Sequence, residues 1–211
     1  MQKGSYHHGD LKNALIQAGS RILVEEGIGA LSLRKVANRA GVSHSAPYAH
    51  FSDKQALVAA ISTEGFHLLY ERLKAAAEAN RSDPAGMLVE VAYAYLSFAL
   101  DSPAFFKVMF SGILEQEKAY PEFVAMSKKN FQLLVELVEQ GQMAGVLPMD
   151  PPDRMAISIW SIVHGFTALM IDRQIPGSLR ESQGLKELLS QVLDQLAMVE
   201  NKKEKHPAKP V

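Results

Sequence analysis

The fold is decided by residues 31–54, which read LSLRKVANRAGVSHSAPYAHFSDK. Ser32 is a favoured N-cap residue, and it stands directly before apolar residues that are spaced three and four apart. Gly41 follows that stripe at the position where a glycine commonly ends a helix. The spacing therefore predicts a two-turn helix over 33–40, a tight turn, and a second short helix over 44–50.

Two short helices joined by a glycine turn are the layout of a helix-turn-helix, whose second helix enters the major groove of DNA. The second segment suits that task because its first residues are small and polar, so its backbone can approach the base edges. The spacing alone fits two short core helices equally well, and the polar face is what favours DNA. The residues expected to face bases or phosphates here are Ser43, His44, Ser45, Ala46, Tyr48, His50 and Lys54.

The charge balance changes along the chain. Residues 1–55 carry seven Lys and Arg against four Asp and Glu, while residues 56–211 carry 15 against 19. Four of the seven histidines also fall in the first segment. A mildly basic head on an acidic body is typical of a nucleic-acid-binding module joined to a part with another function.

Composition excludes several classes of protein. The 211 residues include no cysteine, which excludes disulfide scaffolds, thiolate zinc sites and cysteine nucleophiles. No uninterrupted apolar run reaches the ~18–20 residues of a membrane helix, and the N-terminus has no apolar signal stretch. We expect a soluble, cytoplasmic protein without a membrane partner, cofactor or bound metal.

Helical periodicity continues through the rest of the chain, and no strand pattern or repeat is present. The sequence therefore predicts an all-α protein of about nine helices. We expect a DNA-binding domain over 1–53, a ligand-binding and dimerisation domain over 54–200, and a disordered tail over 201–211. The helices expected after the head cover about 54–80, 85–100, 105–110, 122–144, 153–172 and 183–199.

The N-terminal motifs resemble the tetracycline-repressor (TetR) family in order and spacing. The resemblance implies three N-terminal helices, the third for recognition, and a homodimer that binds palindromic double-stranded operator DNA. It also implies that Ser32 and Arg34 lie near phosphates, Ser43 to Ala46 face the bases, and Tyr48, His50 and Lys54 hold the backbone. The matching residues are Tyr6 to Leu11, Gly27, Ser32 to Ala37, Gly41 to Ser43, Tyr48, His50, Phe51, Asp53 and Lys54.

Three features of the head qualify this resemblance. Pro47 stands where the family usually has an aliphatic residue, and we expect the helix still to form because the lost backbone donor lies at its start. The base-facing stretch lacks Arg and Lys, so guanine contacts would have to come from elsewhere, such as Arg34. His7 and His8 are expected in an N-terminal arm near phosphates rather than in a metal site, since adjacent histidines chelate poorly.

The body is rich in large apolar side chains, which are either plain core or the lining of the ligand pocket that the family resemblance implies. Trp160 to Gly165 also resembles the Trp-His-Gly (WHG) subclass of the family. His164 is either a satisfied core histidine at the dimer seam, which Gly165 favours by implying close helix approach, or a polar anchor in the pocket. The expected ligand-binding residues are Tyr93, Phe105, Phe106, Met109, Phe110, Phe131, Trp160 and His164.

The last helix carries more apolar residues on one stripe than a surface helix needs, so we expect it to pair with a second copy in a four-helix interface. No arrangement of acid, base, nucleophile or metal ligands indicates an enzyme. The function expected is a transcriptional regulator, a repressor modulated by a mainly apolar small molecule; the alternative is an effector-independent protein of chromosome organisation. The expected dimerisation residues are Leu185, Leu188, Leu189, Val192, Leu193 and Leu196.

Overall fold

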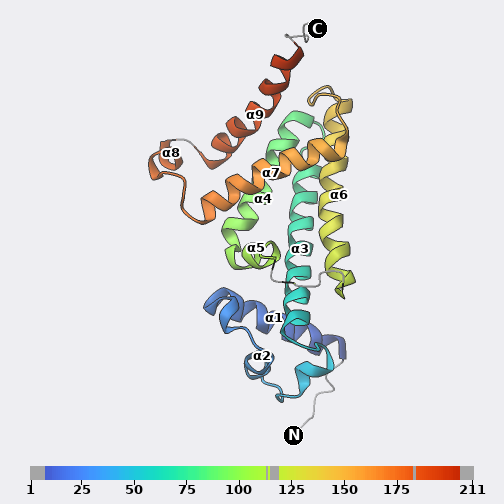
Figure 1. Ribbon diagram of the computed structural model, residues 1–211, viewed down its shortest axis with the longest axis vertical. Helices are drawn as coiled ribbons and strands as arrows, with labels where there is room; N and C mark the ends of the chain where they lie inside the picture. Colours follow the sequence, from blue (N-terminus) through green and yellow to red (C-terminus); the bar gives the residue numbers. More distant parts are fainter. Residues whose placement is uncertain (1–7, 113, 115–118, 183, 205–211) are drawn as a thin grey trace, which may run out of the picture. The chain divides into compact units, whose positions relative to one another are not determined.

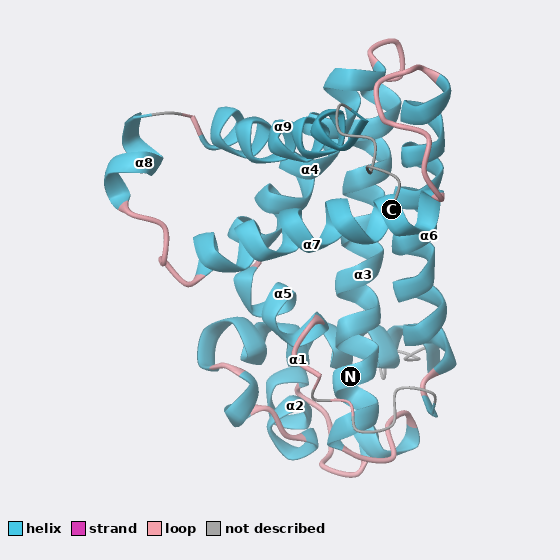
Figure 2. Ribbon diagram, turned by 45° about the horizontal axis from the view of Figure 1, so that its top comes forward, coloured by secondary structure: helices cyan, strands magenta, loops and turns pink. Residues whose placement is uncertain are grey.

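Every regular element that the structure describes is a helix (Figure 1 and Figure 2). The computed structural model describes residues 8–112, 114, 119–182 and 184–204, and in these ranges it has nine α-helices, two 3-10 helices and no strand. The all-α prediction is confirmed. In chain order the elements are α1 (His8–Glu26), η1 (Ile28–Ala30), α2 (Leu33–Ala40), η2 (Ala46–Ala49), α3 (Lys54–Ala79), α4 (Pro84–Asp101), α5 (Pro103–Met109), α6 (Pro121–Met143), α7 (Pro152–Ile171), α8 (Gly177–Ser182) and α9 (Leu185–Glu204).

Proline sets several of the helix starts. Helix α4 begins at Pro84, and Asp83 before it accepts a hydrogen bond from the Gly86 N–H, with 3.1 Å between Oδ1 and N. Helix α5 begins at Pro103. A proline is tolerated at this position because its missing N–H would have no partner within the helix and its fixed φ already suits one.

The C-terminal end differs from the prediction in two respects. Helix α9 continues to Glu204, so the tail expected from residue 201 begins within the helix; residues 205–211 lie outside the described residues. The six-residue helix α8 was not predicted. Its sequence, GSLRES, has a single large apolar residue and therefore no periodic stripe.

The chain folds into two compact units. The first contains the described residues up to Leu68 together with Ser102–Lys128, and the second contains Leu69–Asp101 and the described residues from Lys129 onward. Helix α5 and the first turns of α6 therefore belong to the same unit as the predicted DNA-binding segment. The functional division at residue 53 remains a prediction.

The first unit has an apolar core formed by α1, α2 and the first turns of α3. Leu15, Val36 and Ile61 are fully buried, and each such side chain contributes about 1.5–3 kcal/mol of hydrophobic stabilisation. Gly19 permits a close approach of α1 to α3, since a Cβ there would lie 2.8 Å from Cδ1 of Ile61. This core fixes α2, which carries part of the predicted interface.

In the second unit α4, α7 and α9 pack against one another, and α7 runs obliquely across α4 (Figure 1). Leu96, Ala156 and Leu189 are fully buried there. The burial of Leu189 corrects its assignment to the dimer interface, because its side chain is covered by the same chain. Four other residues of that stripe are half-buried, and the side chain of Leu196 lies outside the described residues; the four are Leu185, Leu188, Val192 and Leu193.

Helix α7 is long and apolar enough to cross a membrane by length and composition alone. Core helices of soluble proteins pass the same test. Helix α7 packs against α4 and α9, and it carries buried side chains from Met155 to Met170. Its outer side keeps Ile157 and Leu169 about half exposed, at 53% and 49%. We therefore treat α7 as a core helix with one uncovered apolar face.

Candidate nucleic-acid interface

Helix α2 is capped at both ends by the residues that the sequence indicates. The Ser32 hydroxyl accepts a hydrogen bond from the Lys35 N–H at 3.2 Å, which satisfies one of the unpaired donors of the first turn. Gly41 ends the helix with φ 69° and ψ 30°, a left-handed conformation that glycine adopts without steric cost. The Val42 N–H donates to the Ala37 carbonyl at 3.0 Å, which completes a Schellman motif.

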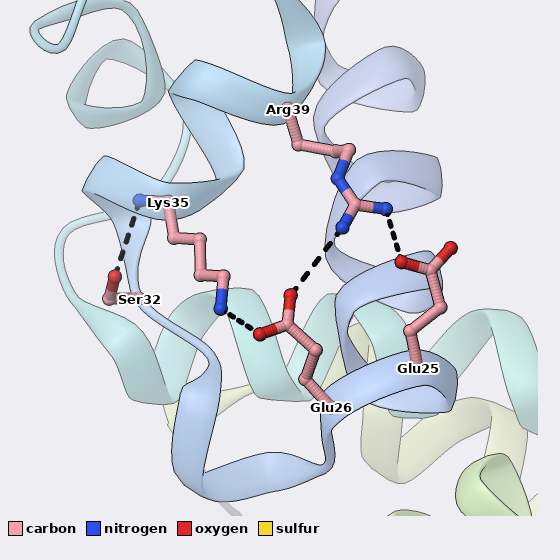
Figure 3. Close-up of polar contacts among 5 residues, drawn as sticks. All are labelled: Glu25, Glu26, Ser32, Lys35 and Arg39. Carbon is pink, nitrogen blue, oxygen red and sulfur yellow. Dashed lines mark hydrogen bonds and ion pairs between the residues drawn. The ribbon is translucent and has the colours of Figure 1, made fainter.

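The basic side chains of α2 have different partners (Figure 3). Glu26 accepts hydrogen bonds from the Lys35 ammonium and, at 3.4 Å, from Nη2 of Arg39. Glu25 accepts from Nη1 of Arg39 at 2.7 Å. Arg34 is exposed and makes no hydrogen bond or ion pair with any residue that the structure describes. The positive charge of Arg34 is therefore available to an anion, while the other two are bound to α1.

The second segment of the motif is a turn followed by the 3-10 helix η2, so the short helix predicted over 44–50 is confined to Ala46–Ala49 and is not an α-helix. Pro47 has no N–H to donate to the Ser43 carbonyl and disfavours α dihedrals at Ala46. The backbone adopts the tighter pattern instead: the Ala46 N–H donates to the Ser43 carbonyl at 3.0 Å and the Tyr48 N–H to the Ser45 carbonyl at 3.2 Å. Pro47 itself is buried, so its ring anchors the segment to the core.

The predicted base-facing side chains are exposed, apart from the half-buried Ala46, and three of them make hydrogen bonds within the motif. Nε2 of His44 lies 2.6 Å from Oδ1 of Asn38, and the hydroxyls of Ser43 and Ser45 lie 3.1 Å apart. Tyr48 is 61% exposed, so its hydroxyl can reach a phosphate. The segment therefore presents a row of small polar groups to solvent.

His50 and Lys54 are less available than predicted. Nε2 of His50 is buried without a hydrogen-bond partner among the described residues. The Lys54 ammonium donates to the Ile28 carbonyl at 3.1 Å, which leaves two of its three donors for a phosphate. Asp53 caps α3, because its Oδ1 accepts from the Ala56 N–H at 2.8 Å.

The predicted ligand-binding residues do not form one cluster within a unit. Four of them belong to the first unit, where Phe106 and Phe110 pack with ring centroids 5.0 Å apart and Met109 is buried. A groove of about 270 Å³ in that unit, between α1, α3 and α5, is lined by Phe105 together with Val24 and Leu68. The other four lie in the second unit and are Tyr93, Phe131, Trp160 and His164.

In the second unit a polar network joins α4 to α7. The Tyr95 hydroxyl lies 2.7 Å from Nδ1 of His164, and the Trp160 ring is 6.0 Å from the His164 ring. Burial raises the pKa of Tyr95, which a hydrogen bond with Trp160 partly opposes, and burial lowers the pKa of His164. Tyr95 is therefore protonated and forms a hydrogen bond with a neutral His164. This gives His164 a partner within its own chain.

Gly165 does not mark a close approach within the chain. A Cβ built on it would meet no described atom within 4 Å, so the close helix approach expected at the dimer seam stays a prediction. In the described part of the chain, moreover, no group of three or more His, Asp or Glu side chains could hold a metal ion. His7 and the side chain of His8 lie outside the described residues, so the predicted N-terminal arm is not among them.

Sequence comparisons identify the family. A family model described as "Bacterial regulatory proteins, tetR family" matches residues 15–61, and one described as "Tetracyclin repressor-like, C-terminal domain" matches residues 88–196, just over half of the chain. The chain belongs to the TetR family. It is accordingly a transcriptional regulator with a helix-turn-helix DNA-binding domain. The description of the C-terminal model names no subclass, so the resemblance to the Trp-His-Gly subclass stays a prediction.

Individual relatives agree with this membership. The TetR-family chain is 23% identical over 156 residues to YobS of Bacillus subtilis (strain 168), an uncharacterised helix-turn-helix-type transcriptional regulator, and the match covers 74% of this chain and 76% of the relative. A protein of unknown function from Rhodococcus sp. RHA1 is 30% identical, with a TM-score of 0.77 over 92% of this chain and 96% of that one. The TetR-family regulator PfmR from Thermus thermophilus is 20% identical and shares the fold, with a TM-score of 0.62 over 85% of this chain and 94% of that one.

The sequence reasoning missed several residues of this TetR-family interface. Asn38, Glu25 and Glu26 were not singled out, although each contacts a residue that the motif contains. The two glutamates end the helix before the motif, and their partners follow 9 to 14 residues later. Acidic residues beside a basic motif were the available signal that some of its charge is neutralised internally.

Proposed function

We propose that this chain is a repressor that binds a palindromic operator as a homodimer through the surface formed by α2, the turn after it and η2. The observation that carries the proposal is the combination of an unpaired Arg34 at the start of α2 with the exposed polar segment from Ser43 to Tyr48. A phosphate at the N-terminus of α2 would meet free N–H groups, the helix dipole and the Arg34 guanidinium together. The polar segment would then face the base edges.

The uncovered face of α7 supports the homodimer. Ile157 and Leu169 are 53% and 49% exposed, and a Cβ added at Gly165 would meet no described atom within 4 Å. Large apolar side chains left exposed along one helix are commonly covered by a protein partner. A two-fold axis along α7 would also bring the half-buried part of the α9 stripe toward the partner subunit.

An effector bound in the second unit would change the relative populations of the form that fits the operator and the form that does not. We infer a mainly apolar ligand held among Tyr93, Phe131 and Trp160, with His164 as the polar contact. A ligand with higher affinity for a form that does not fit the operator lowers DNA affinity by that difference in affinity. Helix α3, which begins beside the DNA-binding surface and continues into the second unit, is the covalent route for this coupling. Like the family in general, the protein would act in the cytoplasm.

Binding to a library of genomic fragments tests the proposal against effector-independent chromosome organisation. The intact protein would be incubated with the library, and bound fragments sequenced with and without a panel of apolar small molecules. A regulator retains a few palindromic sites and releases them with at least one compound. Retention of many unrelated fragments that no compound releases would support the chromosome-organisation alternative instead.

A further inference from the structure

Asn38 and His44 form an exposed hydrogen-bonded pair across the turn of the motif. Oδ1 of Asn38 and Nε2 of His44 are 2.6 Å apart, and both residues are exposed to solvent. Neither side chain contributes to the apolar core, so the pair contributes little to packing. Its effect is to restrict where the His44 ring lies.

The chemistry of the pair fixes the state of the ring. An amide oxygen only accepts hydrogen bonds, so Nε2 of His44 must carry the proton that it donates to Asn38. In the neutral ring the other nitrogen, Nδ1, is then an acceptor. The tautomer of His44 is therefore set by Asn38.

Asn38 is itself held by the turn. It lies in the last turn of α2, and its main-chain carbonyl accepts from the Gly41 N–H at 3.2 Å. Gly41 has the left-handed conformation that reverses the chain toward His44. The residue that sets the tautomer is thus part of the hydrogen-bonded turn at the end of α2, which favours a single orientation of the ring before DNA binds.

An acceptor in the major groove discriminates between bases. Adenine and cytosine present an exocyclic amino group there, whereas guanine presents N7 and O6, which are acceptors. We propose that Asn38 is a positioning residue that holds His44 as an acceptor for the amino group of adenine or cytosine, at one position of each half-site. This inference rests on the proposed operator binding, and it assigns a base class to a segment that has no Arg or Lys.

Base selection by matched variants tests the proposal. Wild type, Asn38→Ala, His44→Ala and the double variant would each select from a random duplex pool, and the ratio of preferred to other bases would be measured at every position. The expected result is a loss of about three- to tenfold in preference for adenine or cytosine at one position per half-site for His44→Ala, as for one hydrogen bond. Asn38→Ala reduces the preference at the same position, and the double variant behaves like His44→Ala alone.

Two further variants separate positioning from general effects. Asn38→Asp keeps the acceptor and should retain the base preference, although its negative charge weakens binding to all sequences. Tyr48→Phe should weaken binding without changing any base preference, and the thermal unfolding midpoints of all variants should match that of wild type. A wild type that selects a palindrome while Asn38→Ala leaves every base preference intact overturns this inference alone. A wild type that selects no sequence overturns the proposed function, and this inference with it.

Discussion

Replacing Arg34 with alanine is expected to weaken DNA binding more than replacing its neighbour Lys35. Both substitutions remove one positive charge from the first turn of the same helix. The Lys35 ammonium is already bonded to Glu26, whereas Arg34 has no partner among the described residues. The two variants are therefore matched in charge and position but differ in how available the charge is.

The size of the effect follows from the number of phosphates that the side chain neutralises and the counterions released with them. Each neutralised phosphate contributes about 0.9 to the slope of log K against log salt concentration, so two Arg34 side chains in a dimer contribute about 1.8. At low salt the same two contacts are worth about 1 kcal/mol each, which corresponds to a loss of about 30-fold in affinity for Arg34→Ala. Lys35→Ala should change the slope by less than half as much.

Fluorescence anisotropy of a labelled operator duplex, titrated at salt concentrations from about 50 to about 300 mM, measures both slopes. Circular dichroism of each variant provides the control that α2 still folds. Equal slope changes in the two variants, or an unchanged slope for Arg34→Ala, would refute the inference that Arg34 is available to phosphate while Lys35 is held by Glu26.

Four further substitutions test other contacts in the structure. Ser32→Ala removes the cap that the Lys35 N–H bonds to and should cost about 1 kcal/mol of unfolding free energy in urea, whereas an unchanged midpoint would show that the cap is redundant. Gly41→Ala places a Cβ at φ 69° and should lower the free energy of unfolding by about 1–2 kcal/mol. Gly165→Ala lies in open space on a helix and should not lower the free energy of unfolding of the single chain. Burial lowers the pKa of His164 below its ordinary value of 6.5, so the folded chain binds a proton there less readily than the unfolded chain. The contribution of the neutral His164 to folding stability is therefore complete above about pH 6.5. It falls as the pH drops through that value toward the pKa in the folded chain. His164→Gln should flatten this part of the profile in thermal melts, and an identical profile for the two proteins would argue against the assignment.

Local signals in the sequence predict the framework of the interface. Ser32 and Gly41 specify the two ends of α2 through their own side chain and backbone, and neither needs the rest of the fold to do so. The shape of the second segment could not be read in the same way. Pro47 was expected to remove one bond at the start of an α-helix, but its effect on Ala46 and its burial together select the 3-10 form.

Tertiary packing decides what the sequence leaves open. The apolar stripe on α9 could pack against a partner subunit or against other helices of the same chain. Leu189 is buried by its own chain. The aromatic residues of the body were expected in one pocket, yet Phe106 and Trp160 belong to different units. The hydrogen bond of Tyr95 could not be predicted from local sequence, because its partner His164 is 69 residues away.

Selection of an operator from a random duplex pool, by the intact protein and by Tyr48→Phe, shows whether the surface formed by α2 and η2 reads a DNA sequence. Tyr48 is exposed, so removing its hydroxyl should leave the fold intact while weakening contact with the DNA backbone. We expect the wild type to enrich a short palindrome whose half-sites are centred at least ~34–36 Å apart, and Tyr48→Phe to enrich the same sequence less strongly. Binding that follows salt concentration alone, with no sequence enriched, would contradict the claim that this surface reads an operator.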